Sequence, residues 1–208
     1  TGMSTPRERA DFPPWSFPLP CDYPHIPVFP ANAPGCFEVA VKSFDLAERF
    51  QTPVIMMSDL DIGMNDWVVP RLTWSASYRP DRGRVLSADD LEKIAKFQRY
   101  TNEDENHVAA RTLPGIHSKG AFFTRGSGHN KFGGYTESPD EYQEVMDRLA
   151  RKHKAAARFV PAPEIRTRPG ARFGVITLGG CEPAVREAIG MLAAQGTAAA
   201  FVPLRGAP

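Results

Sequence analysis

Cysteines and long apolar runs are scarce or absent in this 208-residue chain, and each absence argues against a class of protein. The three cysteines, Cys21, Cys36 and Cys181, show no CxxC spacing, which argues against a disulfide framework and against a cysteine-ligated metal or cluster. No apolar run approaches the roughly 18 residues that a membrane span requires. The first residues lack the apolar middle of a secretory signal. We therefore expect a cytoplasmic protein with reduced thiols.

An excess of charge of one sign is also absent. The 25 basic and 24 acidic side chains give a formal net charge of +1. Nucleic acids and membrane surfaces are recognised through concentrated positive charge, so we expect neither as a partner. Hydrophobic residues make up 42% and charged residues 24% of the chain, which is typical of folded domains and argues against bulk disorder.

Proline, in contrast, is abundant and unevenly placed. Of the twenty prolines, eight lie between Pro13 and Pro34. Proline lacks the amide hydrogen that helix interiors and strand ladders need. We therefore expect this segment to be an extended, ordered arm or loop.

Helical and strand patterns alternate after this segment, which indicates an α/β fold. Residues 34–50 carry apolar groups at the three-and-four spacing of one helix face, and the apolar run after Pro53 is suited to a buried strand. Ser87 and Asp90 resemble a helix cap, followed by Leu91, Ile94 and Phe97 at helical spacing.

A long irregular segment and a well-marked helix follow. Residues 101–137 show no sustained period, and a loop of this length in a compact domain is usually functional. Ser138 and Glu141 mark the start of a helix that runs to about residue 157. Its predicted buried face contains Tyr142, Val145, Met146 and Leu149.

The pattern changes after residue 157. Residues 158–172 are rich in proline, glycine and charge, which predicts an interdomain linker. Residues 173–208 predict a strand, a Gly179–Gly180 packing turn, a helix over 183–195 and a second strand, which together form one βαβ crossover. One crossover cannot bury both faces of its sheet, and the chain begins with threonine. We therefore expect a piece of a longer protein, with a first domain over 1–157 and the start of a second over 173–208.

Two acidic segments leave alternatives open. Asp59, Asp61, Asn65 and Asp66 follow the predicted strand at 54–57, where carboxylates either bind Mg²⁺ or Ca²⁺ or serve as turn and cap residues. No glutamate stands at the spacing of a calcium loop, which favours the second reading. The acidic loop at 101–108 is similarly either a weak cation site or, as we favour, a solvated turn. The histidines show no zinc-binding spacing, and we expect no metal on this chain.

The segment TRGSGHN, residues 124–130, is the most distinctive polar loop. It places four polar side chains between glycines, namely Arg125, Ser127, His129 and Asn130. Glycines let backbone amides approach an anion closely, and Arg125 could hold a carboxylate or a phosphate. The lysine and the preceding strand of a phosphate loop are missing. The segment is therefore either a loop that contacts substrate or a partner, or a tight structural turn.

Several long motifs occur in the order found in one enzyme family. TGMSTPRERADF at the start, SDLDIGMN after the first strand, and RTLPG, FTRGSGHNKF and MDRLARK further on resemble the α subunit of 2-oxoacid:ferredoxin oxidoreductases, especially the 2-oxoglutarate-using branch. FGVITLGGCEPAVREAIGMLAAQG resembles the beginning of the domain that follows in this family. The resemblance extends over nearly the whole chain.

The resemblance implies a specific fold. Residues 1–157 would be the C-terminal half of a thiamine-diphosphate pyrimidine-binding domain, and residues 173–208 the start of a transketolase-C-like α/β domain. The aspartates at 59–66 would be turn and cap residues.

The resemblance also implies an activity and its partners. The reaction would be oxidative decarboxylation of a 2-oxoacid to its acyl-CoA, with coenzyme A as co-substrate and electrons passed to ferredoxin. Thiamine diphosphate and Mg²⁺ would be held mainly by a β subunit, and the iron–sulfur cluster would belong to a partner. The assembly would be a dimer of heterodimers.

Of the family's site residues, the resemblance places only a substrate loop on this chain. Thr5 would bind the distal end of the substrate, flanked by Thr1, Gly2, Met3 and Ser4. The arginine and the glutamate of the family's active site would lie upstream, so we expect no catalytic residue here and no activity from this chain alone. Ser4 and Pro6 depart from the family motif. A pyruvate or branched-chain 2-oxoacid enzyme and a noncatalytic binding or scaffolding module of the same fold are the alternatives.

Overall fold

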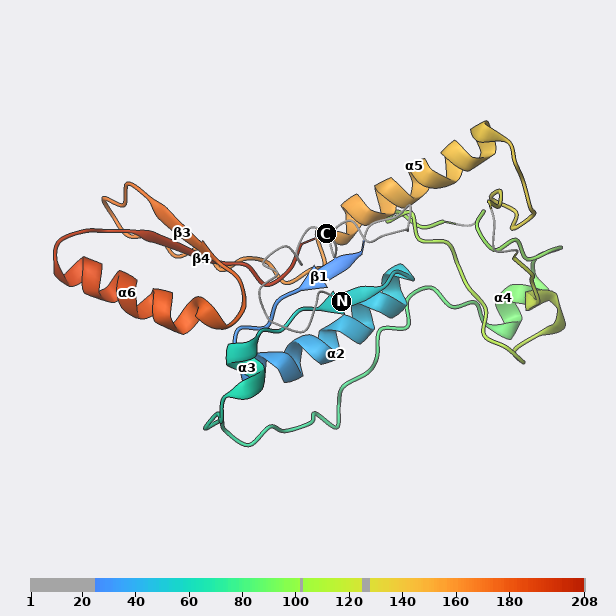
Figure 1. Cartoon of the computed structure of the whole chain (residues 1–208). Coiled ribbons are helices and arrows are strands. Elements are labelled where there is room, and N and C mark those ends of the chain that lie inside the picture. Colours follow the sequence, from blue (N-terminus) through green and yellow to red (C-terminus); the bar gives the residue numbers. More distant parts are fainter. Residues whose placement is uncertain (1–24, 102, 125–127, 208) are drawn as a thin grey trace.

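The computed structural model describes residues 25–101, 103–124 and 128–207 (Figure 1). The expected site residues Thr1, Gly2, Met3, Ser4, Thr5, Arg125 and Ser127 lie outside these ranges. The elements are, in order, β1 (Ile26–Val28), α2 (Ala33–Phe50), β2 (Val54–Met56), α3 (Leu60–Met64), α4 (Ala88–Glu92), η1 (Ser118–Gly120), α5 (Pro139–Ala156), β3 (Gly174–Thr177), η2 (Gly179–Cys181), α6 (Glu182–Ala194) and β4 (Ala200–Pro203). None of the helices in the described part of the chain is long and apolar enough to cross a membrane.

Helix α2 and strand β2 are confirmed close to the predicted boundaries, but the predicted full burial of β2 is wrong, because Met56 is 41% exposed. The side chain of Asn32 accepts a hydrogen bond from the backbone N–H of Gly35 at 2.8 Å and so caps the start of α2. Leu46 and Phe50 on this helix are buried against Ile26 and Val28 of β1 in the main hydrophobic cluster. The helix therefore covers one face of the small sheet.

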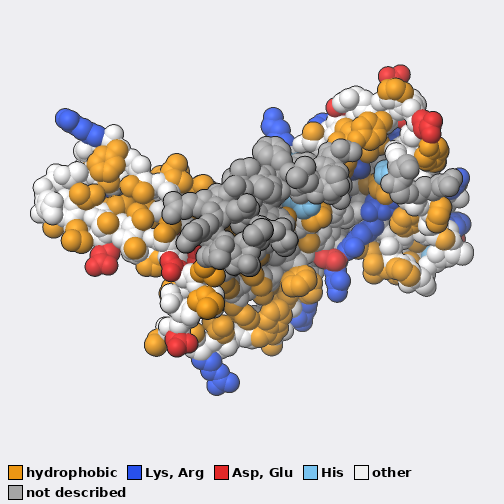
Figure 2. Space-filling view, in the orientation of Figure 1, with side chains coloured by type: hydrophobic (Ala, Val, Ile, Leu, Met, Phe, Trp, Pro, Cys, Tyr) orange, Lys and Arg blue, Asp and Glu red, His pale blue; other side chains and the backbone are white. Residues whose placement is uncertain are grey.

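Much of the predicted apolar face of α2 lies outside that cluster. Phe37, Ala40, Val41 and Phe44 instead line a groove of about 480 Å³ shared with Trp74 and Tyr78. The side chain of Phe44 is 72% exposed. Figure 2 shows this face as a region of apolar side chains over α2. One row of apolar side chains on α2 therefore packs into the core, and a second row lines the groove at the surface.

Strand β1 was not predicted, because it has a proline at its centre. It pairs in parallel with β2, with Ile26 opposite Val54 and Val28 opposite Met56. Residues 205–207 lie along its other side, where the N–H of Phe29 donates to Arg205 O at 2.8 Å and the N–H of Ala207 donates to Pro27 O at 3.0 Å. Pro27 has no amide hydrogen to donate, but its carbonyl oxygen still accepts the hydrogen bond from Ala207, so the proline is tolerated in the strand.

Helix α4 is shorter than the spacing of Leu91, Ile94 and Phe97 predicted. The predicted cap is present, since Ser87 and Asp90 form a reciprocal capping box, but the helix ends at Glu92. Phe97 is still buried, and its ring packs edge-on against Phe122 with centroids 5.8 Å apart. Packing against the irregular segment therefore takes the place of helix continuation.

Helix α5 confirms the prediction over Pro139–Ala156, with Ser138 as its N-cap. The predicted burial of Tyr142 is wrong, because this side chain is 40% exposed. Figure 1 shows the reason: the C-terminal half of α5 lies beside β1, whereas its first turns project away from the central part of the molecule. The buried side chains of α5 are Val145, Lys152 and Ala156.

The βαβ crossover is confirmed in β3, α6 and β4. The two strands are parallel, with Gly174 opposite Ala200 and Thr177 opposite Pro203. Ile189 of α6 packs with Ala199 and Phe201 in a second hydrophobic cluster. Arg166, in the segment predicted to be a linker, exchanges two backbone hydrogen bonds with Phe201 at 2.9 and 2.8 Å. Part of that segment therefore lies against the second sheet.

Candidate functional site

A polar cavity of about 230 Å³ lies between the C-terminal end of α2, the middle of α5 and the segment that follows α4. Three cationic side chains line it, from two different regions of the sequence: Arg99, Arg148 and Lys152. We refer to it as the cationic cavity. Figure 2 shows basic side chains gathered in this part of the molecule, between its centre and the α4 region.

Lys152 is buried, with 8% of its surface exposed. Its ammonium group donates to two carbonyl oxygens at the end of α2, Phe50 O at 2.9 Å and Gln51 O at 3.3 Å. A helix C-terminus carries partial negative charge and unsatisfied carbonyls, so it is a favourable place for a cation. Burial, and after it the positive charges of Arg148 and Arg99, nevertheless lower the pKa of Lys152 to about 8.

Arg99 and Arg148 each donate a hydrogen bond to a backbone carbonyl beside the cavity. Arg99 donates to Ala110 O at 3.3 Å and to the side-chain oxygen of Gln51. Arg148 donates to the carbonyl of His107 at 3.2 Å. Burial lowers the pKa of both guanidinium groups, which still remain protonated at neutral pH because an arginine in a protein does not lose its proton.

Two aromatic rings form another part of the wall. The rings of Tyr100 and His129 are stacked, with centroids 4.4 Å apart and an interplanar angle of 11°. The guanidinium carbons of Arg99 and Arg148 lie 4.9 and 5.7 Å from the centroid of the Tyr100 ring. These cation–π contacts compensate part of the cost of bringing the two cations together.

No carboxylate of a described residue forms an ion pair with any of the three cations. The nearest acidic influence is that of Glu103 on Arg148, which acts at longer range. A neighbouring cavity of about 260 Å³ behind Tyr100 and Arg148 is lined by both Glu103 and Glu144. The charged side chains that line the cationic cavity are therefore all basic, whereas both acidic and basic side chains line its neighbour.

Gln51 positions Arg99 at this site. It ends α2 in a left-handed conformation, with φ 48° and ψ 50°, which is costly for a residue with a side chain. In this conformation its amide group donates to Ala109 O at 2.7 Å while its oxygen accepts from Arg99. A strained helix end thus holds one wall of the cavity.

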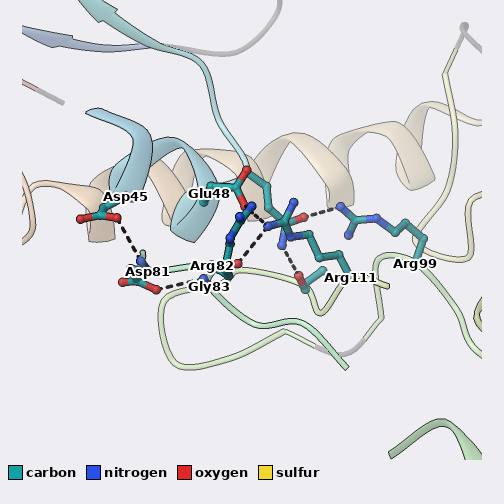
Figure 3. A network of polar contacts seen from close by, with 9 residues as sticks. Asp45, Glu48, Asp81, Arg82, Gly83, Arg99 and Arg111 are labelled. Carbon is teal, nitrogen blue, oxygen red and sulfur yellow. Dashed lines mark hydrogen bonds and ion pairs between the residues drawn. The ribbon is translucent and has the colours of Figure 1, made fainter. Parts of the chain in front are cut away.

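A polar network around the second half of α2 holds the segments before and after α4 (Figure 3). Asp45 accepts hydrogen bonds from the backbone N–H of Asp81 at 2.9 Å and from the hydroxyl of Tyr78 at 2.5 Å. Glu48 pairs with Arg111, and this hydrogen bond is the main reason why the pKa of Glu48 is lowered. The network joins α2 to the chain on both sides of α4.

Of the four polar residues predicted in the loop at 124–130, the structure describes His129 and Asn130, and they make different contacts. His129 lines the cationic cavity, and its assignment to a loop that contacts substrate or a partner stays a prediction. Asn130 is a turn residue, because its side-chain oxygen accepts from the N–H groups of Phe132 at 3.0 Å and Gly134 at 3.1 Å. The assignment of Arg125 and Ser127 stays a prediction.

The aspartates after β2 do not converge. Asp59 caps α3 by accepting from the N–H of Ile62 at 3.0 Å, and it also accepts from the N–H of Gly180 at 2.5 Å. Asp61 and Asp66 are exposed. The reading of Asp59 as a cap residue is confirmed. Within the described ranges no three metal-ligating side chains come together.

Sequence reasoning missed the three cations, although part of the signal was available. Arg148 and Lys152 are one helical turn apart on the face of α5 that also carries Val145 and Ala156. Basic residues at positions that should be apolar indicate a buried polar feature. The convergence of Arg99 with them depends on the irregular segment, for which sequence gives no geometry.

Comparison with known proteins identifies relatives of one kind. No family model matches the chain. The α subunit of 2-oxoacid:ferredoxin oxidoreductase 2 from Aeropyrum pernix is 27% identical over 209 residues, which cover 99% of this chain and 31% of that protein. The α subunit of the 2-oxoacid:ferredoxin oxidoreductase of Saccharolobus solfataricus is 19% identical over 212 residues, with 99% and 32% covered.

A solved structure supports the same relationship at the level of the fold. The 2-oxoglutarate:ferredoxin oxidoreductase from Magnetococcus marinus, with 2-oxoglutarate, coenzyme A and succinyl-CoA bound, superposes with a TM-score of 0.67 at 22% identity. The match covers 88% of this chain and 31% of that chain. The chain spans about a third of the length of the curated relatives it matches. Over nearly all of its length, as its motifs predicted, the chain is related to the α subunits of 2-oxoacid:ferredoxin oxidoreductases.

Proposed function

We propose that the chain is part of the α subunit of a thiamine-diphosphate-dependent 2-oxoacid:ferredoxin oxidoreductase that oxidises 2-oxoglutarate to succinyl-CoA. The observation that carries this proposal is the alignment of 99% of the chain with α subunits of such enzymes. The Magnetococcus marinus structure, with its bound 2-oxoglutarate and coenzyme A, supports the choice of substrate and co-substrate.

Residues 1–157 act, in this proposal, as the C-terminal half of the pyrimidine-binding domain, and residues 173–208 begin the next α/β domain. The Thr5 loop contacts the distal end of the 2-oxoacid. The loop with His129 contacts substrate or a partner. Residues 158–172 connect the two domains.

Thiamine diphosphate supplies the carbanion chemistry of the reaction when it is bound. On the basis of the family resemblance, the proposal assigns the diphosphate and its Mg²⁺ mainly to a β subunit. The electrons pass through a partner's iron–sulfur cluster to ferredoxin, in a dimer of heterodimers. This 208-residue segment alone is inactive.

Exposed apolar surface supports a role inside a larger assembly. Phe44 and Trp74, which both line the apolar groove over α2, are 72% and 62% exposed. A contiguous apolar surface of this kind is typical of regions covered by other protein.

The test is to produce the full-length α subunit together with its β subunit and to measure coenzyme A-dependent reduction of ferredoxin. We expect 2-oxoglutarate to give the highest kcat/KM. Highest activity with pyruvate or a branched-chain 2-oxoacid would correct the substrate. Absence of activity with every 2-oxoacid, in a complex that binds thiamine diphosphate, would instead favour a noncatalytic module of this fold.

A further inference from the structure

The cationic cavity concentrates more positive charge than its structural contacts use. Lys152 has three N–H donors, and two of them are engaged by the carbonyls at the end of α2. Arg148 has five, and among the described residues one hydrogen-bond acceptor, the carbonyl of His107, engages it. Neutral side chains could donate the same hydrogen bonds to backbone carbonyls without the repulsion between neighbouring positive charges. Hydrogen bonding to carbonyls alone therefore does not explain why all three side chains are cationic.

The electrostatic balance favours a bound anion. Arg99 and Arg148 are close enough to Lys152 for each to disfavour its protonated form. A buried charge is costly unless it is paired, and here the buried ammonium of Lys152 and two half-buried guanidinium groups lie around one void with no described carboxylate paired to them. An anion in the void would convert mutual repulsion into attraction at all three groups.

The size of the cavity limits the ligand to a small group. Its volume of about 230 Å³ lies below the roughly 300–1,000 Å³ of pockets that enclose whole small molecules. It therefore suits a free anion or the anionic end of a larger molecule. The stacked rings of Tyr100 and His129 give this space a rigid wall.

The number and kind of donors favour phosphate over carboxylate. A carboxylate carries one negative charge, which leaves two of the three cations uncompensated. A phosphate monoester carries about −1.5 to −2 charges at pH 7 and three acceptor oxygens. Guanidinium groups match phosphate oxygens with paired donors, and a lysine ammonium adds a compact point charge.

We propose that Arg99, Arg148 and Lys152 form a phosphate-binding site on this chain. The site rests on the geometry of the cavity and stands or falls independently of the proposed oxidoreductase function. The phosphate is either free or part of a phosphorylated ligand, and the experiment separates these two sources.

The test measures how fast Lys152 reacts with acetic anhydride in the intact protein, read peptide by peptide by mass spectrometry. Bound phosphate stabilises the protonated ammonium and blocks access to it, so labelling slows. By mass action we expect a ~tenfold lower rate at about ten times the dissociation constant of phosphate. The exposed Lys154, two residues further along α5, is the internal control and keeps its rate.

Three probes are compared at equal ionic strength: inorganic phosphate, glycerol 3-phosphate and acetate. Protection of Lys152 by both phosphates and not by acetate supports a site for a phosphorylated ligand. Protection by inorganic phosphate alone supports a site for the free ion. Equal protection by acetate, or none by either phosphate, would overturn the proposal.

A pair of variants on one helix sharpens the result. Arg148→Gln should raise the phosphate concentration needed for half-protection of Lys152 about tenfold, because one charged hydrogen bond is lost. Arg151→Gln removes an exposed positive charge from the same helix and should leave that concentration within about twofold. Equal effects of both variants would show that only the general charge of α5 matters. The labelling of Lys152 in the unaltered protein tests the proposal even if a variant does not fold.

Discussion

Asp59 and Gly180 are 121 positions apart in sequence, yet the carboxylate of Asp59 accepts a hydrogen bond from the backbone N–H of Gly180 at 2.5 Å. The same carboxylate caps α3 through the N–H of Ile62. A Cβ on Gly179 would lie 2.5 Å from this carboxylate, and Gly179 has a positive φ of 66°. The double glycine therefore lets the turn after β3 approach the turn after β2.

Asp59→Ala should loosen both turns at once. Loss of the cap costs about 1–2 kcal/mol, and the Gly180 amide loses its partner as well. Hydrogen–deuterium exchange of the intact protein should become faster at the amides of Ile62 and Gly180 together. Asp61→Ala, an exposed neighbour in the same turn, is the control and should change neither amide. Faster exchange at Ile62 alone would show that the contact between the two turns is absent in solution.

Gly83→Ala should be one of the most destabilising small substitutions in the chain. Gly83 has φ +64°, and an added Cβ would lie 2.8 Å from Arg49 Cα and from Glu48 O. The backbone conformation costs a side chain about 1–2 kcal/mol, and overpacking against a helix backbone adds about 1–3 kcal/mol. Urea denaturation followed by circular dichroism should therefore show a clear drop in the free energy of unfolding.

Gly115→Ala is the matched control for that change. Gly115 has φ +82°, but nothing lies within 4 Å of an added Cβ. It should incur only the backbone cost of about 1–2 kcal/mol. If the two variants were equally stable, the close approach of the Gly83 loop to α2 would not exist in solution.

The elements with complete local signals were predictable from the sequence. α5 begins at a serine cap followed by proline, and α2 and the βαβ crossover carry clear apolar spacing. β1 was missed because Pro27 reads as a loop residue, and its strand geometry depends on β2 and on the distant segment at 205–207. α4 ended early because Phe97 is buried by a contact with Phe122 that no local pattern encodes.

The candidate site was less predictable for the same physical reason. The sequence marked the loop with His129, and the structure places this residue at a cavity. Its charged partners come from α5 and from the segment after α4, and only the fold brings these together. A histidine near glycines is visible as a motif, whereas three cations around a void are a tertiary feature.

Thr5→Ala should alter substrate selection in the complete enzyme, on the basis of the family resemblance of the loop TGMST. If the hydroxyl binds the distal carboxylate of 2-oxoglutarate, its loss costs about 1.5–3 kcal/mol in binding. The KM for 2-oxoglutarate should therefore rise more than the KM for pyruvate. Thr5→Ser keeps the hydroxyl and should stay close to the unaltered enzyme. Equal increases for both substrates would show that Thr5 does not bind the distal group.

Lys152 should give the protein an unusual dependence of stability on pH. Its pKa is about 8 in the folded protein, against the ordinary lysine value of 10.5. Below pH 8 the group is protonated in both the folded and the unfolded states. Between about pH 8 and 10.5 the folded state loses this proton while the unfolded state keeps it. Because the unfolded state then binds more protons, the free energy of unfolding rises with pH, by at most about 1.4 kcal/mol per pH unit.

Lys152→Met removes this titration and should abolish the rise. The charged groups facing Lys152 are Arg99 and Arg148, which stay protonated over this range, and Tyr100 and His129 line the same cavity. Urea denaturation at pH 7.5 and pH 9.5 should therefore show a stability gain in the unaltered protein and in Lys154→Met, but not in Lys152→Met. The buffers must be free of phosphate and sulfate, because a bound anion would hold the proton on Lys152 and mask the effect. The same gain in Lys152→Met would mean that Lys152 titrates normally and that its ammonium is not buried among cations.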